Sequence, residues 1–597
     1  MSLDSERSFT LTRRFLLLGA GKLLATTILA GRLSYLQISQ HKKYKTLSDG
    51  NRIHTDLMPP VRGRILDARG TVYAKSIKYY ELSMVRNQVK DVSDSLKRLS
   101  SLFPLSATEI DKIKNNVRLK PRFVPVMIKD RLEWEDVLKF ESHAYNFPGV
   151  SISENYNRLY PRAHEACHLV GYVAHAAKED KTDNDLVGLR KGKSGIEYAK
   201  QDLLVGTPGI RHIEVDAVGR EIRELENTPP QHGQDLQLTF DGRLQAEVES
   251  ILRQHKSASA VVMDVHTGYI KAMASYPSFD PNIFPDILTA KNWEKIQKNP
   301  YAPMTNKVLI GQYSPASTFK MVTALAALEH RVVSPGHTIE CNGHHQVGNR
   351  KFHCWKWHGP KNMMQALAES CDVYFYQIAL KVGIEKIAAT ANRLGLGLPT
   401  DIDLVGEKIG FVPTKAWKRR RFNKSWTLGD TVNACIGQGY MLATPLQLAV
   451  MTARLCNGGL EVHPSTVLTP GKTPERAPSI GIAPGNLKTI LRGMNGACNW
   501  GTGTIRRNRI ETPGFEMGGK TGTSQVKGIS MRERESGIIK QEDLNWKKRD
   551  HALFVGYAPV HKPKYATCVV VEHGGWGGRA AAPVGKEILY QAQLLKV

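Results

Sequence analysis

One apolar run near the N-terminus constrains this chain more than any other feature. Residues 15–30 read FLLLGAGKLLATTILA, and no second apolar run of that length follows in the 597-residue sequence. A membrane-spanning helix needs about 20 apolar residues, so we expect the helix to continue to about residue 38. Lys22 lies inside the run and would cost about 2.5–3.5 kcal/mol at the bilayer centre unless its amine reaches the interface. The run predicts an uncleaved membrane anchor within residues 1–40.

Basic residues on the N-terminal side of the run predict its orientation. Arg7, Arg13 and Arg14 precede the run, and the positive-inside rule places such residues in the cytoplasm. The rest of the chain is therefore predicted to lie outside the cytoplasm. A cleaved signal peptide is the alternative, although no small-residue cleavage site follows the run.

The net charge indicates an anionic partner. Lys and Arg number 82 against 56 Asp and Glu, a formal charge of +26, which favours association with acidic polymers or lipid surfaces. The basic residues are scattered apart from short runs such as 419–421, and neither zinc-finger spacing nor an aromatic RNA-binding motif occurs. With most of the chain outside the cytoplasm, we exclude nucleic acid and favour membrane lipid or cell-wall polymer.

The sequence pattern after the anchor changes once, near residue 236. Residues 41–235, here called the pedestal, are polar, with β-like runs at 64–66 and 149–152 and a charged helical portion near 106–141. No catalytic constellation stands out in the pedestal. We therefore predict one domain at 41–235 and a second at 236–597.

The second domain shows strands at both ends and helices between them. The predicted elements are two strands around a turn at 266–268, helices across 318–505, strand-like runs at 514–517, 551–557 and 565–571, and a closing helix at 580–596. This order predicts an α+β fold in which helices cover an antiparallel sheet.

A Ser-x-x-Lys motif opens the helical region. Residues i and i+3 of a helix are neighbours, so Ser317 and Lys320 share one face. A serine at a helix N-terminus has backbone N–H groups nearby to stabilise an oxyanion, and a neutral lysine can activate it as a base. The motif alone is weak, because it also occurs at 39–42 and 524–527.

Two further motifs follow. Ser370-Cys371-Asp372 precedes an aromatic-rich helical pattern, and alone it would be a helix cap. Lys520-Thr521-Gly522-Thr523 follows two glycines, and alone it would be an ordinary strand entered by a turn. Such a strand at a sheet edge can also bind an extended peptide.

The order and spacing of the three motifs resemble the penicillin-binding proteins and serine β-lactamases, whose Ser-x-x-Lys, Ser-x-Asn and Lys-Thr-Gly motifs line one cleft. Other segments narrow the resemblance to the class B penicillin-binding proteins of the elongation type, penicillin-binding protein 2. These segments are residues 60–65, 192–197, 274–282, 437–439 and 444–447. Two positions depart from the common pattern: Asp372 replaces the Asn of relatives outside this subgroup, and Ala316 replaces the glycine that usually precedes the serine.

The resemblance implies a D,D-transpeptidase that cross-links peptidoglycan stem peptides during cell elongation and is a target of β-lactams. It also implies an extended β-rich pedestal that carries a transpeptidase domain. Ser317 would form the acyl-enzyme, Lys320 would accept its proton, and Ser370, oriented by Asp372, would relay a proton to the leaving amine. The terminal carboxylate of the substrate would be held by Lys520, Thr521, Gly522 and Thr523, and the oxyanion by the N–H groups of Ser317 and Thr523.

The resemblance also implies location and partners. The anchor would lie in the inner membrane and the catalytic domain in the periplasm. The implied partners are peptidoglycan stem peptides, glycan derived from lipid II, the SEDS glycan polymerase RodA, MreC and β-lactams. A D,D-carboxypeptidase or β-lactamase would use the same three motifs, and a scaffold that activates the polymerase is a third alternative.

Four residues between the first two motifs predict a metal site. Cys341, Cys354, His358 and Cys371 have the spacing C-x12-C-x3-H-x12-C, and three thiolates with one imidazole suit tetrahedral zinc. Relatives of the elongation type have a zinc site in this region, although the Cys-to-His step here is about two residues shorter than usual. His344, His345 and His353 are alternative ligands, and a disulfide is the alternative to zinc. Acyl transfer itself needs no cofactor.

Overall fold

The computed structural model describes residues 4–41, 53–122, 124–175, 190–215, 221–284, 290–469, 471, 475–528, 533 and 539–597. These form two compact units. The N-terminal unit contains 1–61, 78–156 and 206–232, and the C-terminal unit contains 62–77, 157–205 and 233–597. The units interleave in sequence because strands β3 (Val72–Val85) and β5 (Val150–Leu159) each begin in one unit and end in the other. The predicted boundaries at 40 and 235 stay a prediction.

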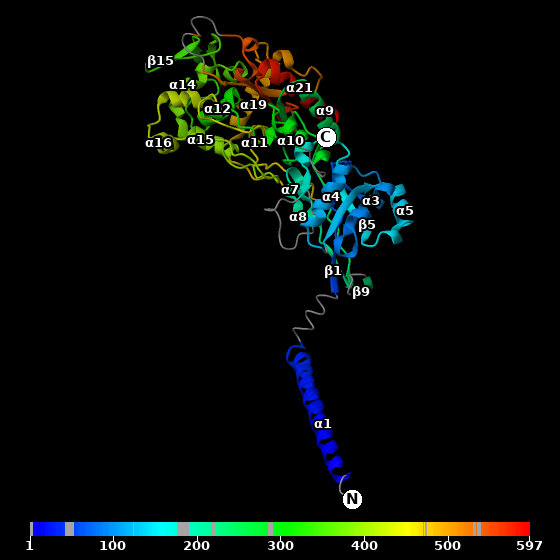
Figure 1. The fold of residues 1–597 in the computed structure, drawn as a ribbon. Helices are drawn as coiled ribbons and strands as arrows, with labels where there is room; N and C mark the ends of the chain where they lie inside the picture. Colours follow the sequence, from blue (N-terminus) through cyan, green and yellow to red (C-terminus); the bar gives the residue numbers. More distant parts are fainter. Residues whose placement is uncertain are drawn as a thin grey trace. The chain divides into compact units, whose positions relative to one another are not determined.

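Helix α1 (Asp4–Ser34) is the predicted anchor (Figure 1). A π-helical segment, Tyr35–Ser39, continues it. The stretch Arg13–Ser39 is long and apolar enough to cross a membrane, with 27 residues and a mean hydropathy of 1.4. Its leucines, such as Leu17 and Leu24, are exposed rather than packed against protein. A helix that is apolar all round without a protein partner fits a membrane anchor.

The N-terminal unit is built around a small core of its own. Leu82, Leu96, Phe103, Ile113 and Phe140 are among its buried residues. Besides α1, β3 and β5, the α-helices and strands of this unit are β1 (Ile53–Met58), α3 (Val92–Leu102), α4 (Ala107–Leu119), β4 (Pro125–Leu132), α5 (Trp134–Glu141), β8 (Gly209–Val215) and β9 (Glu221–Thr228). The charged helical portion predicted near 106–141 is thus two helices separated by β4, a strand that the prediction missed.

The C-terminal unit has a five-stranded antiparallel sheet, as predicted. The strand order is β12-β11-β19-β18-β17, which places the first two strands of the domain beside the last three. Their bounds are β11 (Ala258–Asp264), β12 (Ile270–Tyr276), β17 (Gly518–Ser524), β18 (His551–Ala558) and β19 (Tyr565–Val571). Strand β17 lies at one edge of the sheet.

One predicted strand is wrong. Residues 514–517 are not a strand, because Pro513 and Gly514 form a turn in which the N–H of Phe515 donates to the carbonyl of Thr512 at 3.0 Å. Gly514 has a φ of +83°, which favours glycine. Strand β17 begins after this turn, so the Lys-Thr-Gly motif lies in the strand itself.

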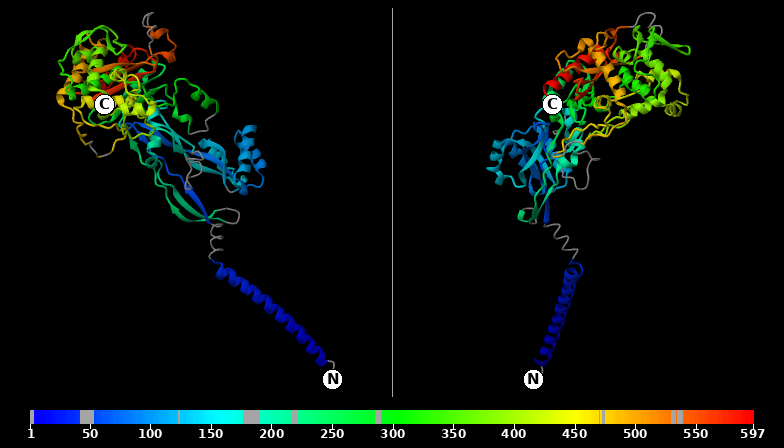
Figure 2. Two further views of the ribbon diagram at one scale, coloured as in Figure 1. Left: turned by 90° about the vertical axis from the view of Figure 1, so that its left-hand side faces the viewer. Right: turned by 180° about the vertical axis from the view of Figure 1, so that it is seen from behind.

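Both faces of the sheet are buried. Successive side chains of a strand point to opposite faces, and on β11 Val262 joins one apolar core while Val261 and Met263 join the other. Helices α9 (Gly242–Leu252) and α21 (Gly577–Leu594) pack on the first face, and α18 (Pro445–Cys456) packs on the second. Figure 2 shows the chain from two further sides, with α21 in red. The α+β class is therefore confirmed.

The insertion between the strands carries most of the remaining elements. Besides α18, its α-helices are α10 (Ala290–Gln297), α11 (Lys307–Ile310), α12 (Lys320–Glu329), α13 (Met363–Ala368), α14 (Asp372–Val382), α15 (Ile384–Arg393), α16 (Lys415–Phe422), α17 (Leu428–Ala434) and α19 (Pro484–Asn499). Four short strands interrupt them: β13 (Ile339–Cys341), β14 (His344–Val347), β15 (Arg350–His353) and β16 (Gly359–Lys361). These short strands were not predicted.

The remaining elements of the C-terminal unit are short. They are β2 (Ile65–Leu66), β6 (Val173–His175), β7 (Arg190–Gly192), β10 (Leu236–Gln237), α6 (Cys167–Val170), α7 (Gly195–Ala199) and α8 (Gln201–Val205). Glu197 of α7 is buried between Arg62 and Arg158, with N–O distances of 2.6 and 2.7 Å. Burial alone would raise the pKa of Glu197, but the two guanidinium groups lower it below its usual value. Arg62 and Glu197 belong to two of the segments that carry the family resemblance, residues 60–65 and 192–197.

The buried imidazole of His168 should make stability depend on pH. Its Nε2 lies 2.7 Å from the carbonyl oxygen of Pro303, and burial lowers the pKa of His168 to about 4 from 6.5. The unfolded chain therefore takes up the proton first, and stability present at neutral pH is lost as the pH falls from about 6.5 to about 4. The full loss is about 3 kcal/mol. Urea unfolding of detergent-solubilised protein should show a smaller loss between pH 7 and 4.5 in His168→Gln, which keeps a donor toward Pro303. Equal losses in both proteins would contradict the assignment.

Candidate active site

Ser317 lies in a short 3₁₀ turn, Ala316–Phe319, that leads directly into α12. Ala316 has a φ of +51°, a left-handed conformation that costs a non-glycine residue about 1–2 kcal/mol. Its N–H donates to the carbonyl of Gly437 at 2.9 Å, and the hydroxyl of Thr318 donates to that of Pro315 at 2.6 Å. The conformation explains why glycine is usual before the serine and shows that this chain tolerates alanine there.

Lys320 is fully buried and makes three polar contacts. Its Nζ lies 2.9 Å from the carbonyl oxygen of Ser370, 3.1 Å from the Ser370 hydroxyl and 2.7 Å from Oδ1 of Asp372. An ammonium group has three N–H donors, so each can have a partner. The first two predicted motifs are therefore in direct contact.

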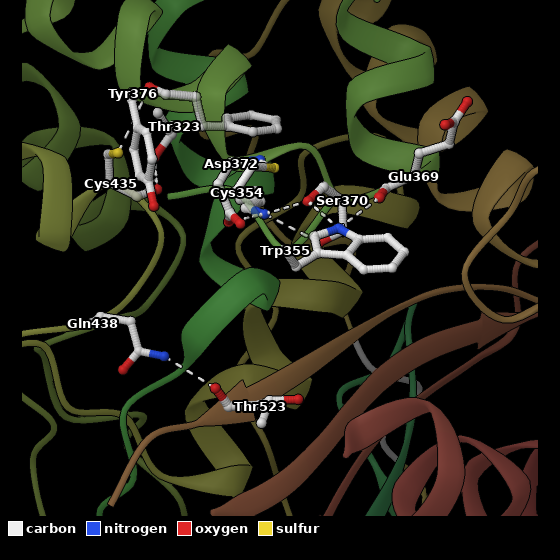
Figure 3. Close-up of polar contacts among 12 residues, drawn as sticks. Thr323, Cys354, Trp355, Glu369, Ser370, Asp372, Tyr376, Cys435, Gln438 and Thr523 are labelled. Carbon is white, nitrogen blue, oxygen red and sulfur yellow. Dashed lines mark hydrogen bonds and ion pairs between the residues drawn. The ribbon is translucent and has the colours of Figure 1, made fainter. Parts of the chain in front are cut away.

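Ser370 and Asp372 flank the start of α14 (Figure 3). Ser370 has a φ of +58°, and Cys371 occupies the N-cap position of the helix. Burial raises the pKa of Asp372, and the positive charge of Lys320 opposes that rise without cancelling it. The carboxyl group was predicted to orient Ser370; the structure shows an ion pair with Lys320.

The Lys-Thr-Gly motif lies on the edge strand β17. Lys520 is fully buried, and both burial and the nearby charge of Lys320 lower its pKa well below the usual value. The carbonyl of Thr523 accepts a hydrogen bond from Nε2 of Gln438 at 3.0 Å (Figure 3). The N–H and C=O of one residue in an antiparallel strand point to the same side, so the N–H of Thr523 also faces away from β18.

Gly522 brings β17 against the turn that carries Ser317. A Cβ atom at Gly522 would lie 2.9 Å from the carbonyl oxygen of Pro315 and 3.3 Å from the Cβ of Ala316. The structure thus places all three motifs around one site, with Ser317, Thr521 and Thr523 partly exposed. The chemical role of each residue stays a prediction.

The four predicted metal ligands also lie together. The Sγ atoms of Cys341, Cys354 and Cys371 and a ring nitrogen of His358 are all within 4.8 Å of one another. Nδ1 of His358 lies 3.6 Å from Sγ of Cys341 and 3.5 Å from Sγ of Cys354. A tetrahedral zinc ion would require sulfur–nitrogen separations of about 3.6 Å, so the donor set fits zinc. The alternative ligands His344, His345 and His353 are not part of this group.

Contacts behind the ligands support the same arrangement. Nε2 of His358 lies 3.2 Å from the carbonyl of Glu369, and a proton on Nε2 leaves Nδ1 free to bind metal. The N–H of Asp372 donates to Sγ of Cys354 at 3.2 Å, and a hydrogen bond from Cys371 lowers the pKa of Cys354. All eight cysteines are free thiols, and the five outside the group (Cys167, Cys435, Cys456, Cys498 and Cys568) are buried, as predicted.

Sequence reasoning missed two residues that contact the motifs. Gln438 holds Thr523, and Nε1 of Trp355 lies 3.2 Å from the carbonyl oxygen of Ser370 (Figure 3). Gln438 could have been identified from the sequence, because it lies in the 437–439 segment that carries the family resemblance. For Trp355, the sequence held only one indication of a role, its position directly after the predicted metal ligand Cys354.

Close packing between β17 and the Ser317 turn should make Gly522 sensitive to enlargement. Gly522→Ala places a methyl group against a backbone carbonyl that cannot rotate away, so the strand must shift. Displacements of this kind at a reacting site cost large factors in rate, and we expect the rate constant for acylation by a fluorescent penicillin to fall about tenfold or more. Gly528→Ala is the matched control, because nothing lies within 4 Å of its added Cβ. Equal rates in the two variants would refute the packing argument.

Comparison with known proteins agrees with this geometry. The family model of the penicillin-binding protein transpeptidase domain matches residues 258–590, and that of the penicillin-binding protein dimerisation domain matches 57–238. The peptidoglycan D,D-transpeptidase MrdA of Escherichia coli K12 is 33% identical over 605 residues, covering 98% of this chain and 94% of that protein. The complex of penicillin-binding protein 2 with MreC from Helicobacter pylori superposes with a TM-score of 0.82 at 28% identity, covering 91% of this chain and 99% of that one.

A second solved structure, of a peptidoglycan synthase complex that coordinates polymerization and crosslinking, gives a TM-score of 0.70 at 28% identity, covering 96% of this chain and 97% of that one. The match extends over the anchor, the pedestal and the catalytic domain, and it agrees with the order of the three motifs. The chain therefore belongs to the penicillin-binding protein 2 (MrdA) family of class B penicillin-binding proteins, the peptidoglycan D,D-transpeptidases.

Proposed function

We propose that Ser317 is the nucleophile of this transpeptidase and that Lys320, Ser370 and Asp372 move its proton. The observation that carries the proposal is the contact of the Lys320 amine with both the Ser370 hydroxyl and the Asp372 carboxyl group. In its neutral form the Lys320 amine can accept the proton of Ser317, and Oδ1 of Asp372, 2.7 Å away, is placed to hold the proton that this amine carries in the ion pair. The total charge of the pair is the same as in the ion pair.

The reaction then follows in two balanced transfers. Oγ of Ser317 attacks the carbonyl carbon between the two terminal D-alanines of a donor stem, and its proton passes to Lys320. The C–N bond breaks as Ser370 passes its proton to the departing amine of D-alanine and takes up the proton held by Lys320, 3.1 Å away. An ester on Ser317 remains. An amine of a neighbouring stem attacks this ester, forms the cross-link and returns a proton to Ser317.

Strand β17 is proposed to bind the end of the donor stem. Lys520 and the hydroxyls of Thr521 and Thr523 would hold its terminal carboxylate, with Gly522 letting the substrate approach the strand. The N–H groups of Ser317 and Thr523 would stabilise the oxyanion, and each such donor is worth roughly 2.7–4 kcal/mol. Water in place of the acceptor amine would give carboxypeptidase activity at the same site.

We further propose that Cys341, Cys354, His358 and Cys371 hold one structural zinc ion. The separations of the donor atoms and the orientation of His358 by Glu369 support it. Bound zinc would hold together the segments of the chain that contribute these ligands. Because Cys371 stands between Ser370 and Asp372, the ion would also fix the loop that carries the proposed proton relay.

Partners and orientation are proposed from the relatives and the anchor. The Helicobacter pylori relative binds MreC, and the second solved structure couples polymerization to crosslinking. We propose that the pedestal, residues 41–235, contacts an MreC-type protein and the polymerase RodA. Arg13 and Arg14 precede the apolar part of α1, which supports an N-terminus in the cytoplasm and a catalytic domain, residues 236–597, in the periplasm.

Loss of the nucleophile tests the proposed catalytic residue. Ser317→Ala should abolish covalent labelling by a fluorescent penicillin, because no hydroxyl remains to form the ester. Ser524→Ala, in the second Ser-x-x-Lys sequence of the catalytic domain, should label at the wild-type rate. Thermal unfolding confirms that both variants are folded. Labelling of folded Ser317→Ala would refute the proposal.

Metal analysis tests the zinc site. Protein purified without chelator should contain about one zinc ion per chain, and Cys354→Ser should lose most of it, since one of the four ligands required by a closed site is gone. Cys456→Ser, at a buried thiol outside the group, should retain the metal. A wild-type protein without zinc that also titrates fewer than eight free thiols would favour a disulfide.

A further inference from the structure

Trp355 links the loop of proposed metal ligands to the second catalytic motif. It directly follows Cys354 and precedes His358 in the sequence. Its Nε1 lies 3.2 Å from the carbonyl oxygen of Ser370 and 3.3 Å from that of Glu369. The indole N–H therefore points at two consecutive carbonyls of the motif loop, while the side chain as a whole is half exposed, at 51%.

The loop that receives this hydrogen bond needs external support. Ser370 has a φ of +58°, which lies in the left-handed region of backbone conformations. A residue other than glycine stays in this sparsely populated region only when contacts with its surroundings hold it there. The carbonyl of Ser370 accepts from Nζ of Lys320 as well as from Trp355, and the carbonyl of Glu369 accepts from His358 as well as from Trp355. Figure 3 shows the contacts of Trp355 with Ser370 and Glu369. Trp355 is thus the one side chain among the described residues that contacts both carbonyls.

Rotation of the Ser370 peptide would disturb the proposed proton relay directly. The same residue offers Lys320 two acceptors, its carbonyl oxygen at 2.9 Å and its hydroxyl at 3.1 Å. If the carbonyl turned, Lys320 would lose one partner and its distance to the hydroxyl would change. A positioned proton-transfer group works only within hydrogen-bond reach of its partner.

We propose that Trp355 is a positioning residue for acylation and that its indole N–H holds the Ser370 carbonyl so that Ser370 and Lys320 keep their mutual geometry. The inference rests on the proposed roles of these two residues. Trp355 does not itself touch the reacting atoms. Through it, the Cys354–His358 loop and the catalytic motif act as one rigid body.

A neighbouring tryptophan gives a matched control. Trp357 lies two residues along the same loop and is 66% exposed, and it takes part in none of the hydrogen bonds found in the described part of the chain. An indole has one N–H donor and no acceptor, so replacement by phenylalanine at either position removes one donor and leaves an aromatic ring. Only the change at Trp355 removes a bond to the motif.

The test measures acylation of the full-length, detergent-solubilised, zinc-loaded protein by a fluorescent penicillin over a range of concentrations. In Trp355→Phe we expect the limiting acylation rate constant to fall 10- to 100-fold, with the dissociation constant of the initial complex changed less than threefold. Trp357→Phe should stay within twofold of wild type in both. Hydrogen exchange of residues 366–372 should accelerate in Trp355→Phe alone.

A third variant isolates the N–H group. Incorporation of 3-benzothienylalanine at position 355 keeps the shape of the indole and replaces its N–H with sulfur, and it should reproduce the slow acylation of Trp355→Phe. Wild-type acylation in either variant overturns the proposal. So does loss of zinc in Trp355→Phe, because the residue would then support the metal loop instead of the relay. Failure of the wild-type protein itself to be labelled at Ser317 would contradict the proposed function and not the role of Trp355.

Discussion

The buried amine of Lys320 is the interaction on which the catalytic unit depends. A charge cannot be buried without partners at acceptable cost, and Lys320 finds all three of its partners on Ser370 and Asp372. These residues come from a loop about fifty positions later in the sequence. The buried amine of Lys320 therefore needs α12 and α14 to be in contact, just as the packing of the apolar core does. The same contact brings the first two motifs together.

The loop that supplies these partners is held by several contacts. Ser370 has a left-handed conformation, which costs about 1–3 kcal/mol and must be imposed by the surroundings. His358 and Trp355 bind the carbonyls of Glu369 and Ser370, and the N–H of Asp372 reaches Sγ of Cys354. The cysteine-rich loop therefore serves the active site through geometry. The proposed zinc ion would therefore affect acyl transfer through the geometry of this loop.

Sequence reasoning predicted the parts of this arrangement that follow from local pattern. The motif order, the strands β11, β18 and β19, and a grouping of Cys341, Cys354, His358 and Cys371 were all predicted from short segments. It could not predict the ion pair between Asp372 and Lys320, because that contact depends on packing between helices that are far apart in the sequence. The short strands β13–β16 were also missed, since strands of three or four residues are too short to show an alternation of apolar and polar residues. The misplaced strand at 514–517 shows a local failure, in which a Pro-Gly turn was taken for the strand that follows it.

The charge balance at the site suggests why Lys520 is left without an acidic partner of its own. Its only hydrogen bond in the described part of the structure is to the carbonyl of Thr521 at 3.3 Å, and burial with the nearby charge of Lys320 lowers its pKa. Two buried amines thus share one carboxyl group, that of Asp372. A substrate that brings its own carboxylate to β17 restores the balance and favours the charged form of Lys520. On the proposed roles of Ser317 and Lys520, a ligand without that carboxylate would leave Lys520 in its neutral form, so the cluster that activates Ser317 would also select for the free C-terminus of a stem peptide.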